Sequence, residues 1–532
     1  MKRFLALILL ATMLLTSMNV SFAEQAYEEH IHYYGSGWML NTNANYDDAY
    51  YAYFTKKFNM DFQPYYTDSS TNDSTVNLLV NTSSMPDGLV GKSFNYDTYL
   101  EWVDQGLIAP LPDGWETKYP NLYDMLVATG ILDYITVDGQ VFCIPHATWY
   151  NFVKMDTAVE HISLFYRKDW AAELGMTELF ANDQVKVSDL LAFCKAAVDA
   201  GLGDNGKTVG LTTSSNEYII DLVGNTLPYN FDSFNKTENG YAWGAAMEGT
   251  VEMVKTLREY YQSGSIDPDF YLGNGLDTFT SGAAAGIMYT GTANSTSSLI
   301  NPFVEAHNEL KAELETLRAT DPAAYPYDTS VKDMIGFATV IGDDGVVYAI
   351  ETSNYWSYNI FNPDIDPAVF DRILCLIDWL CTPEGEVVSK IGIPEVDWVW
   401  DVKNESIIQI PNADGAYNSY DAKNMLTQYG LCSDEMALVK KENAPYLINF
   451  IKQAYATKNE GVIRAYDFDY KFFTSQAKSE YSCDIKAEIV GLMVDGTLDI
   501  DTEWAAFIEE NAGMVNPLIA DLNAEFYPEL GK

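Results

Sequence analysis

The chain has 532 residues, a formal net charge of −45 and 48% hydrophobic residues. A chain of this length needs two or three lobes to bury its core, and its hydrophobic content excludes an intrinsically disordered protein. The strong negative charge repels phosphate backbones and anionic lipids, so it excludes nucleic acid and anionic membrane surfaces as direct partners.

The first 23 residues have the pattern of a secretory signal peptide. Met1-Lys2-Arg3 is a basic start, Phe4–Leu15 is almost wholly apolar, and Ser21-Phe22-Ala23 is a small-x-small cleavage site. No later stretch approaches 18 apolar residues without charge. We therefore expect residues 1–23 to be removed and the mature protein to be exported and to act outside the cytoplasmic membrane.

The first elements predict a parallel sheet. Alternation predicts a strand at His30–Tyr34, helical spacing predicts a helix at Asn45–Phe58, and a second strand follows at Met60–Tyr66. Such a βαβ start joins parallel strands, whose carboxyl ends usually hold the ligand, and Ser36 and Trp38 fall there. Trp38 is equally well explained as a loop aromatic packed on its own lobe.

The pattern then alternates between helices and strands. Asp138-Gly139 predicts a tight turn with Ile135 and Val141 on paired strands, and Pro145 is expected to end that ladder. Polar loops are expected at Ser214–Tyr218 and Thr290–Asn294. Predicted strands include Leu89–Val90, Ile162–Tyr166, Thr208–Thr213, Gly286–Tyr289, Met334–Thr339 and Val346–Ile350. Predicted helices include Thr75–Asn81, Tyr96–Gln105, Lys168–Leu174, Asp189–Ala200 (capped by Ser188), Met247–Gln262, Pro302–Leu317 (capped by Asn301), Pro367–Leu380, Ser433–Lys441, Pro445–Tyr455, Ile485–Val494, Glu503–Glu510 and Asn516–Phe526.

The sequence lacks the common motifs of catalytic and nucleotide-binding sites. There is no G-x-S-x-G, no H-E-x-x-H and no P-loop lysine motif, and 76 acidic residues make any single carboxylate pair uninformative as a glycosidase site. His30 and His32 share one face of the predicted strand, but two metal ligands without a third make a weak site. The six cysteines allow fifteen disulfide pairings. We expect no catalysis, no cofactor and no metal, although the question of a structural calcium ion at an acidic turn stays open.

Five motifs in order carry a family resemblance: Met85-Pro86-Asp87, Gln105-Gly106-Leu107-Ile108-Ala109-Pro110-Leu111, Tyr119-Pro120-Asn121, Asp138-Gly139-Gln140-Val141-Phe142-Cys143-Ile144-Pro145 and Arg167-Lys168-Asp169-Trp170. In this order the chain resembles the family 1 extracellular solute-binding proteins, the substrate-capturing subunits of ABC importers, especially large oligosaccharide-binding members of Gram-positive bacteria. One departure concerns anchoring. Many members end their signal at a lipidated cysteine, whereas the first cysteine here is Cys143.

The resemblance implies a two-lobed α/β fold of the periplasmic-binding-protein kind, with a hinge and a ligand cleft between the lobes. The N-terminal lobe is expected to comprise 24–145 and about 345–400, and the C-terminal lobe 146–344 and about 401–532 with helical additions. The implied function is capture of a carbohydrate, with an oligosaccharide expected, by a monomer that delivers it to the permease subunits of an ABC transporter. Arg167 and Asp169 are expected to be structural.

Candidate ligand contacts follow from their position on loops at strand ends or on the crossing between lobes: Ser36, Trp38, Lys92, Phe94, His146, Trp149, Tyr150, Asn216, Tyr218, Thr292 and Asn294. The abundant Tyr and Trp suit stacking on sugars, although most aromatics pack in cores. A peptide ligand, a secreted polysaccharide-degrading enzyme and a surface adhesin are the alternatives, the last disfavoured because repeats are absent.

Overall fold

The computed structural model describes residues 27–37, 40, 42–147, 162–203, 206–224, 226–290, 293–307, 312, 334–346, 348–350, 355–401, 406–414, 417–429, 462–464 and 467–529. The predicted signal peptide, Trp38, Trp149, Tyr150, Thr292 and the predicted helices at Ser433–Lys441 and Pro445–Tyr455 lie outside these residues. The chain forms two compact units. The first comprises Met1–Thr148 and Tyr355–Cys432, and the second comprises Trp149–Asn354 and Ser433–Lys532.

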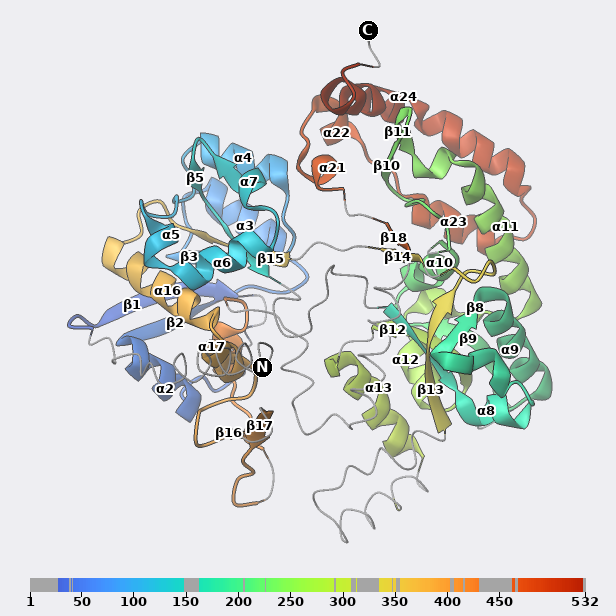
Figure 1. Ribbon diagram of the computed structural model, residues 1–532, viewed down its shortest axis with the longest axis horizontal. Coiled ribbons are helices and arrows are strands. Elements are labelled where there is room, and N and C mark those ends of the chain that lie inside the picture. Colours follow the sequence, from blue (N-terminus) through green and yellow to red (C-terminus); the bar gives the residue numbers. More distant parts are fainter. Residues whose placement is uncertain are drawn as a thin grey trace, which may run out of the picture. The chain divides into compact units, whose positions relative to one another are not determined.

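The first unit contains a five-stranded mixed sheet in the order β2-β1-β3-β15-β6 (Figure 1). Its strands are β1 (Ile31–Gly37), β2 (Met60–Tyr66), β3 (Gly88–Gly91), β6 (Ile144–Ala147) and β15 (Tyr355–Phe361). Strand β1 pairs in parallel with both β2 and β3, as the sequence predicted, while β15 runs antiparallel to β3 and to β6.

The helices of this unit pack around that sheet, with α16 against β1 and α6. They are α2 (Ala49–Phe58), α3 (Asn72–Asn81), α4 (Tyr96–Asp104), α5 (Trp115–Lys118), α6 (Pro120–Ala128), α7 (Leu132–Ile135), α16 (Pro367–Leu380), α17 (Pro383–Lys390) and α18 (Lys423–Leu426). Helix α16 has the predicted bounds. Its N-cap residue Asp366 accepts hydrogen bonds from two backbone amides, and Pro367 occupies the first position, where a missing N–H costs nothing.

Two short hairpins complete the first unit. Strands β4 (Thr136–Val137) and β5 (Gln140–Val141) are joined through Asp138 and Gly139, which both have positive φ, at 50° and 79°. This is the backbone of the tight hairpin turn that the sequence predicted, although Ile135 ends helix α7 instead of lying on a strand. Strands β16 (Trp398–Asp401) and β17 (Ser406–Gln409) form the second hairpin.

The expected end of the ladder at Pro145 was wrong. Pro145 lies within β6 and sits opposite Tyr358 of β15. Strand β6 is at the edge of its sheet. An edge strand tolerates proline because the missing N–H can face away from its single neighbour.

The second unit contains a five-stranded sheet in the order β8-β13-β7-β12-β9 (Figure 1). Its strands are β7 (Ile162–Arg167), β8 (Gln184–Lys186), β9 (Val209–Thr213), β12 (Ala284–Thr290) and β13 (Ile335–Ile341). Strand β12 pairs in parallel with β9, and β13 in parallel with β8, whereas β7 runs antiparallel to both β12 and β13. Two further pairs are β10 (Phe234–Thr237) with β11 (Gly240–Trp243), and β14 (Tyr348–Ile350) with β18 (Val462–Arg464).

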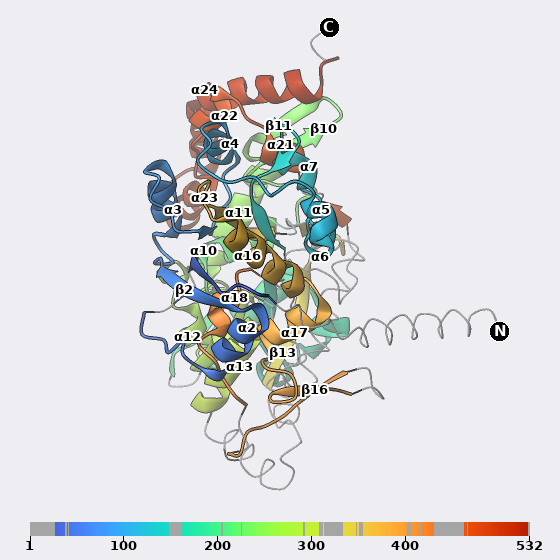
Figure 2. The ribbon, with the colours of Figure 1, turned by 90° about the vertical axis from the view of Figure 1, so that its left-hand side faces the viewer.

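A helical layer at the end of the chain covers part of this unit. The long helix α24 runs beside β11 and α22 in both views (Figure 1 and Figure 2). The helices are α8 (Lys168–Glu173), α9 (Val187–Ala200), α10 (Asn216–Gly224), α11 (Glu248–Ser263), α12 (Gly275–Thr280), α13 (Ala293–Ala306), α21 (Phe468–Phe472), α22 (Gln476–Glu480), α23 (Ile485–Val494) and α24 (Ile500–Phe526), with 3₁₀ turns at Thr177–Asp183, Gly244–Ala246 and Phe270–Leu272.

Several predicted boundaries in the second unit were wrong. The last two predicted helices are one helix, α24, with Pro517 inside it, and Pro302 likewise lies inside α13 instead of opening a helix. Ser188 lies within α9, whose N-cap is Lys186, and its hydroxyl donates to Asp343 at 2.7 Å. Tertiary contacts at these points override the local capping signals.

The expected lobe boundaries also differ from the two units. Strand β14, which falls in the stretch expected to belong to the N-terminal lobe, belongs to the second unit, and the chain re-enters the first unit at Tyr355. Residues 401–432, which we assigned to the C-terminal lobe, belong to the first unit. Their side chains pack into it: Tyr420 stacks on Tyr50 at 5.8 Å between ring centroids, and Tyr429 lies edge-on to Tyr33.

The fold class is confirmed, since the chain has two α/β units that each contain a sheet. Cys143, Cys194, Cys375, Cys381 and Cys483 are free thiols, while Cys432 lies outside the described residues. Within the part of the chain that the structure describes, no helix is both long and apolar enough to cross a membrane.

Candidate ligand-binding site

Four of the predicted contact residues meet at one edge of the first unit's sheet. Strand β6 is antiparallel to β15, which is antiparallel to β3, so β1, β2, β3 and β6 all end at the same edge. Ser36 lies near the end of β1, Lys92 and Phe94 follow β3, and His146 is near the end of β6. Ligands of open α/β sheets usually bind at this edge. We call these residues, together with the start of β15, the first-unit edge.

The backbone of this edge is held by two hydrogen-bond anchors, one of which is buried. Ser36 is fully buried, and its hydroxyl accepts from the amide of Val90 at 3.0 Å. The carboxylate of Asp73 accepts from the amides of Lys92 and Ser93, at 2.9 and 3.0 Å. Ser36 therefore joins β1 to β3 and offers no exposed hydroxyl, whereas the half-buried Lys92 side chain follows a loop that is fixed at its backbone.

A cluster of aromatic rings surrounds Phe94. Its ring lies edge-on to Tyr355 and Tyr358 of β15, at 6.2 and 5.4 Å, and contacts Tyr99 of α4 at 5.4 Å. Tyr96 adds a tilted contact at 6.5 Å and stacks on Tyr99. Such offset and edge-on contacts fix ring orientation. Phe94 itself is half-buried, so the cluster presents a partly exposed ring on a rigid base.

The phenol groups below Phe94 are committed to the fold. Tyr96 and Tyr99 donate to the carbonyl oxygens of Tyr134 and Ile135, at 2.9 and 2.5 Å, and so fix helix α7. Burial raises the pKa of Tyr96, and raises that of Tyr99 and Tyr358 more strongly, because an ionised phenolate would be desolvated there. These rings stay neutral, so the cluster offers apolar faces and not charge.

His146 contacts an exposed tryptophan beside this cluster. Its ring lies 5.7 Å from that of Trp356, tilted by 37°, and the Trp356 side chain is 37% exposed. His146 is 2% exposed, and its Nδ1 lies 3.1 Å from the hydroxyl of Ser357. A serine beside a histidine suggests a nucleophile and its base, but Ser357 is fully buried. The pair therefore offers no exposed nucleophile, and the His146 ring lies against the exposed Trp356.

The remaining predicted contacts belong to the second unit. Asn216 and Tyr218 lie in the first turn of α10, directly after β9, and not in the loop that we expected. Asn294 lies in the first turn of α13, after β12. Because β9 and β12 are parallel neighbours, both helices start from one edge of their sheet. Helix starts carry partial positive charge and unpaired amides, which favour polar ligand groups.

Arg167 and Asp169 have the structural role that we expected. Arg167 donates to the Asp169 carboxylate through Nε at 2.8 Å and Nη2 at 2.6 Å. Its guanidinium also lies 4.4 Å from the ring centroid of Trp170, which is a cation–π contact. The Arg167 side chain is only 4% exposed. Because it is held there, its ion pair with Asp169 orients the start of α8.

Sequence reasoning missed the aromatic run at the start of β15. Tyr355, Trp356 and Tyr358 were not singled out, although three aromatics in four residues are a visible signal. Only the pairing of β15 between β3 and β6 brings that run to the first-unit edge. The two strands it pairs with precede it by more than 200 residues, so no local pattern reports the contact.

Comparison with solved structures finds proteins that share the fold of this chain. No protein-family model matches the chain, and no curated protein matches its sequence. Solved structures do match. The alginate-binding protein AlgQ2 without calcium has a TM-score of 0.62 at 14% identity, covering 94% of this chain and 99% of that one. The ABC-transporter substrate-binding protein FusA of S. pneumoniae, in complex with kestose, has a TM-score of 0.63 at 12% identity, covering 94% and 100%.

A third match extends the range of ligands. The N-glycan transport solute-binding protein NgtS of Streptococcus pneumoniae has a TM-score of 0.58 at 13% identity, covering 94% of this chain and 99% of that one. At these identities the likeness shows the fold. The descriptions of all three proteins name a binding protein, and none of them names an enzyme.

Proposed function

We propose that this protein is the exported carbohydrate-binding subunit of an ABC importer, and that an oligosaccharide is its ligand. The observation that carries the proposal is that two partly exposed aromatic side chains, Phe94 after β3 and Trp356 near the start of β15, lie at the first-unit edge of a fold shared with carbohydrate-binding proteins. Sugar rings present apolar C–H faces that stack on aromatic rings, and their hydroxyls need hydrogen-bonding groups at the rim.

Each unit, taken by itself, carries proposed ligand contacts of a different kind. The first-unit edge supplies ring faces, with Lys92 beside them as a polar group. In the second unit the first turns of α10 and α13 supply Asn216, Tyr218 and Asn294, whose amides and hydroxyl suit sugar hydroxyls. Trp38, Trp149, Tyr150 and Thr292 stay proposed contacts from their position in the sequence. Ser36 is left out because its hydroxyl is buried in the sheet.

A thermal-shift screen over oligosaccharides and peptides tests the proposal. A ligand that binds only the folded protein stabilises it by mass action, by about 2.7 kcal/mol at a hundredfold excess over Kd, and so raises its melting temperature. We expect an oligosaccharide to raise the melting temperature and a one-to-one complex to appear in calorimetry. A shift with peptides alone would replace the sugar assignment, and no shift with either class would end the binding proposal.

The competing proposal is that the protein is a secreted polysaccharide-degrading enzyme. A second measurement on the same samples distinguishes this proposal from binding. Oligosaccharides incubated with catalytic amounts of the protein should stay intact. Product formation that depends on the protein would overturn the binding proposal in favour of an enzyme. Delivery to a transporter is tested by uptake of the identified sugar in cells with and without the gene.

A further inference from the structure

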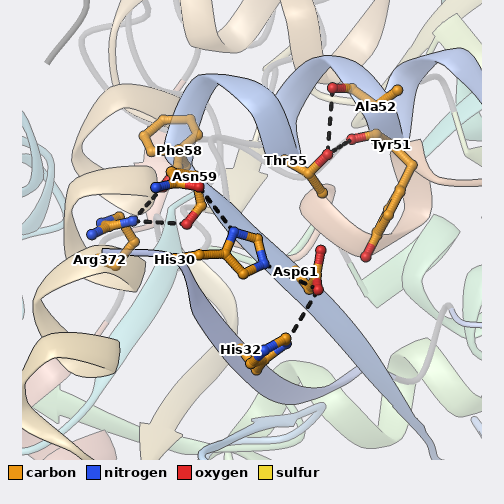
Figure 3. A network of polar contacts seen from close by, with 9 residues as sticks. All are labelled: His30, His32, Tyr51, Ala52, Thr55, Phe58, Asn59, Asp61 and Arg372. Carbon is orange, nitrogen blue, oxygen red and sulfur yellow. Dashed lines mark hydrogen bonds and ion pairs between the residues drawn. The ribbon is translucent and has the colours of Figure 1, made fainter. Parts of the chain in front are cut away.

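Two histidines and one aspartate converge on the surface of the first unit. His30 Nε2 and His32 Nδ1 each lie 3.1 Å from the same carboxylate oxygen, Oδ2 of Asp61. One ligand atom from each residue lies within 4.8 Å of the other two. Figure 3 shows the rings of His30, which precedes β1, and of His32, which lies on β1, with the carboxylate of Asp61 between them. Along the sequence no third ligand is visible beside His30 and His32, and the fold supplies one in Asp61.

The register of the sheet explains this convergence. His30 directly precedes β1, and His32 is the second residue of that strand. Residues i and i+2 of an extended chain point to the same side, so the two rings share one face. In the parallel pairing of β1 with β2, His32 lies opposite Asp61. The side chains are exposed, at 45% for His30, 74% for His32 and 45% for Asp61, so no core packing requires this arrangement.

A hydrogen-bonded residue behind His30 sets which nitrogen faces Asp61. Nδ1 of His30 lies 2.9 Å from the amide oxygen of Asn59, whose amide nitrogen donates to the carbonyl of Tyr27 at 2.9 Å. Because the amide nitrogen is used by Tyr27, the oxygen must face His30 and accept from its Nδ1–H. When the ring is neutral, the lone pair of Nε2 therefore faces the carboxylate, and two acceptors face each other unless a proton or a metal ion lies between them.

Asn59 is itself held in place by buried contacts. It caps the end of α2 in a left-handed conformation with φ 45°. The guanidinium of Arg372, which is 6% exposed, donates to the carbonyl oxygens of Phe58 at 2.5 Å, Asn59 at 3.0 Å and Glu29 at 3.2 Å. An orienting partner of this kind is the usual outer shell of a histidine that binds a metal.

We propose that His30, His32 and Asp61 form a Zn²⁺ site at the surface of the first unit, with its fourth position open to solvent. Two imidazoles and one carboxylate are a donor set that zinc accepts, whereas calcium and magnesium prefer oxygen ligands. Tetrahedral zinc with bonds of about 2.1 Å separates its ligand atoms by about 3.4 Å. The two nitrogen–oxygen distances are already close to this value, and the exposed His32 ring is free of core packing that would oppose adjustment.

Bound zinc would link the start of β1 to the start of β2 and replace the repulsion between the facing acceptors. A proton on Nε2 of His30 would also remove this repulsion, because it would form a hydrogen bond to Asp61. Zinc and protons would therefore compete for Nε2 of His30. The proposal does not depend on carbohydrate binding, because none of its three residues belongs to the first-unit edge.

Calorimetry of the chelator-treated full chain with ZnCl₂ tests the site. We expect one zinc per chain, with affinity weakened at least about tenfold in His32→Gln and in Asp61→Asn, the loss of one ligand from three. Asp68→Asn is the matched control, an exposed carboxylate that follows the same strand β2, and it should leave the affinity unchanged. The His32 side chain is so exposed that its variant should melt at the wild-type temperature without metal.

Two results would overturn the site. If the wild type binds zinc no more tightly than magnesium, the cluster is a proton-sharing triad or the uptake reflects the acidic chain as a whole. If zinc binds but both variants bind it equally well, the metal lies elsewhere. Anomalous diffraction at the zinc edge gives a second readout, with the expected peak between His30, His32 and Asp61.

Discussion

The hydroxyl of Tyr429 donates a hydrogen bond to the carbonyl oxygen of Ser36 over 3.2 Å, joining residues 393 positions apart. The hydroxyl oxygen of Tyr429 also lies 3.2 Å from the hydroxyl oxygen of Tyr33, and both phenols are buried. Since Tyr429 uses its proton on Ser36, Tyr33 donates to Tyr429. This chain of hydrogen bonds ties the segment around α18 to the end of β1, and so places residues 417–429 in the first unit.

Tyr429→Phe should therefore destabilise the first unit by about 1–2 kcal/mol, because it leaves the Tyr33 hydroxyl and the Ser36 carbonyl buried without their partner. Urea unfolding followed by tryptophan fluorescence measures the change. Tyr66→Phe, at a side chain that is 40% exposed, should stay within about 0.5 kcal/mol of the wild type. Equal stability of both variants would mean that water replaces the hydroxyl without cost.

Asp378 of α16 supports the start of a second helix. Its carboxylate accepts from the backbone amides of Asn121 and Leu122 at 2.7 and 2.9 Å, and from the Asn121 side chain at 2.9 Å. Helix α6 has no side-chain cap of its own. Asp378→Ala should cost about 1–2 kcal/mol, the range of a lost N-cap. Asp124→Ala, at an exposed carboxylate on α6 itself, is the control and should change the free energy of unfolding little.

The Asp371 carboxylate should contribute to acid unfolding. Burial raises its pKa, but hydrogen bonds from Lys118 and Tyr119 and the charge of Lys118 outweigh this and lower the pKa below its ordinary value. A lowered folded-state pKa gives stability that is present above the unfolded pKa, near 3.9, and is lost as the pH falls through the folded pKa.

Asp371→Asn should accordingly be less stable than the wild type at neutral pH, and the difference should shrink below about pH 4. Chemical unfolding at a series of pH values measures it. Asp104→Asn, at an exposed carboxylate at the end of α4, should follow the wild-type curve. A difference between wild type and Asp371→Asn that does not vary with pH would show that charge is not the cause.

Two helical glycines of the second unit should respond to alanine in opposite directions. A Cβ on Gly275 would lie 2.0 Å from the carbonyl oxygen of Thr213, a backbone atom that cannot move aside cheaply, while nothing lies within 4 Å of a Cβ on Gly491. Gly491→Ala in α23 should stabilise by about 0.5–1 kcal/mol through helix propensity. Gly275→Ala should lower the melting temperature, and an unchanged value would mean that α12 shifts freely on the sheet.

A comparison of two equally exposed tryptophans of the first unit distinguishes loss of ligand stacking from a general effect of removing a surface tryptophan. Trp356 and Trp400 are each 37% exposed, but only Trp356 lies at the first-unit edge, while Trp400 lies on the β16–β17 hairpin. With a ligand identified, Trp356→Ala should weaken binding about tenfold, since an aromatic contact contributes about 0.5–1.5 kcal/mol beyond its buried area. Trp400→Ala should leave Kd unchanged. Equal losses in both would remove Trp356 from the site.

The sequence by itself determined the local elements and the class of the fold. Strand β2 and helices α16 and α23 have the predicted bounds, because hydrophobic periodicity, caps and glycine stops act over a few residues. The tight turn at Asp138-Gly139 follows in the same way from the residues that tolerate positive φ. The family resemblance in five ordered motifs then predicted a two-lobed α/β fold, which is the fold that this chain shares with solved structures.

Only the tertiary structure decided which distant segments meet. Pro145 was expected to end a ladder, yet it lies in an edge strand whose partner, β15, comes more than 200 residues later. That pairing brings Trp356 to His146, and the parallel register of β1 with β2 brings Asp61 to His32. Strand order and register depend on packing across the whole unit, which no local pattern encodes. Two histidines were visible in the sequence, and the carboxylate between them was not.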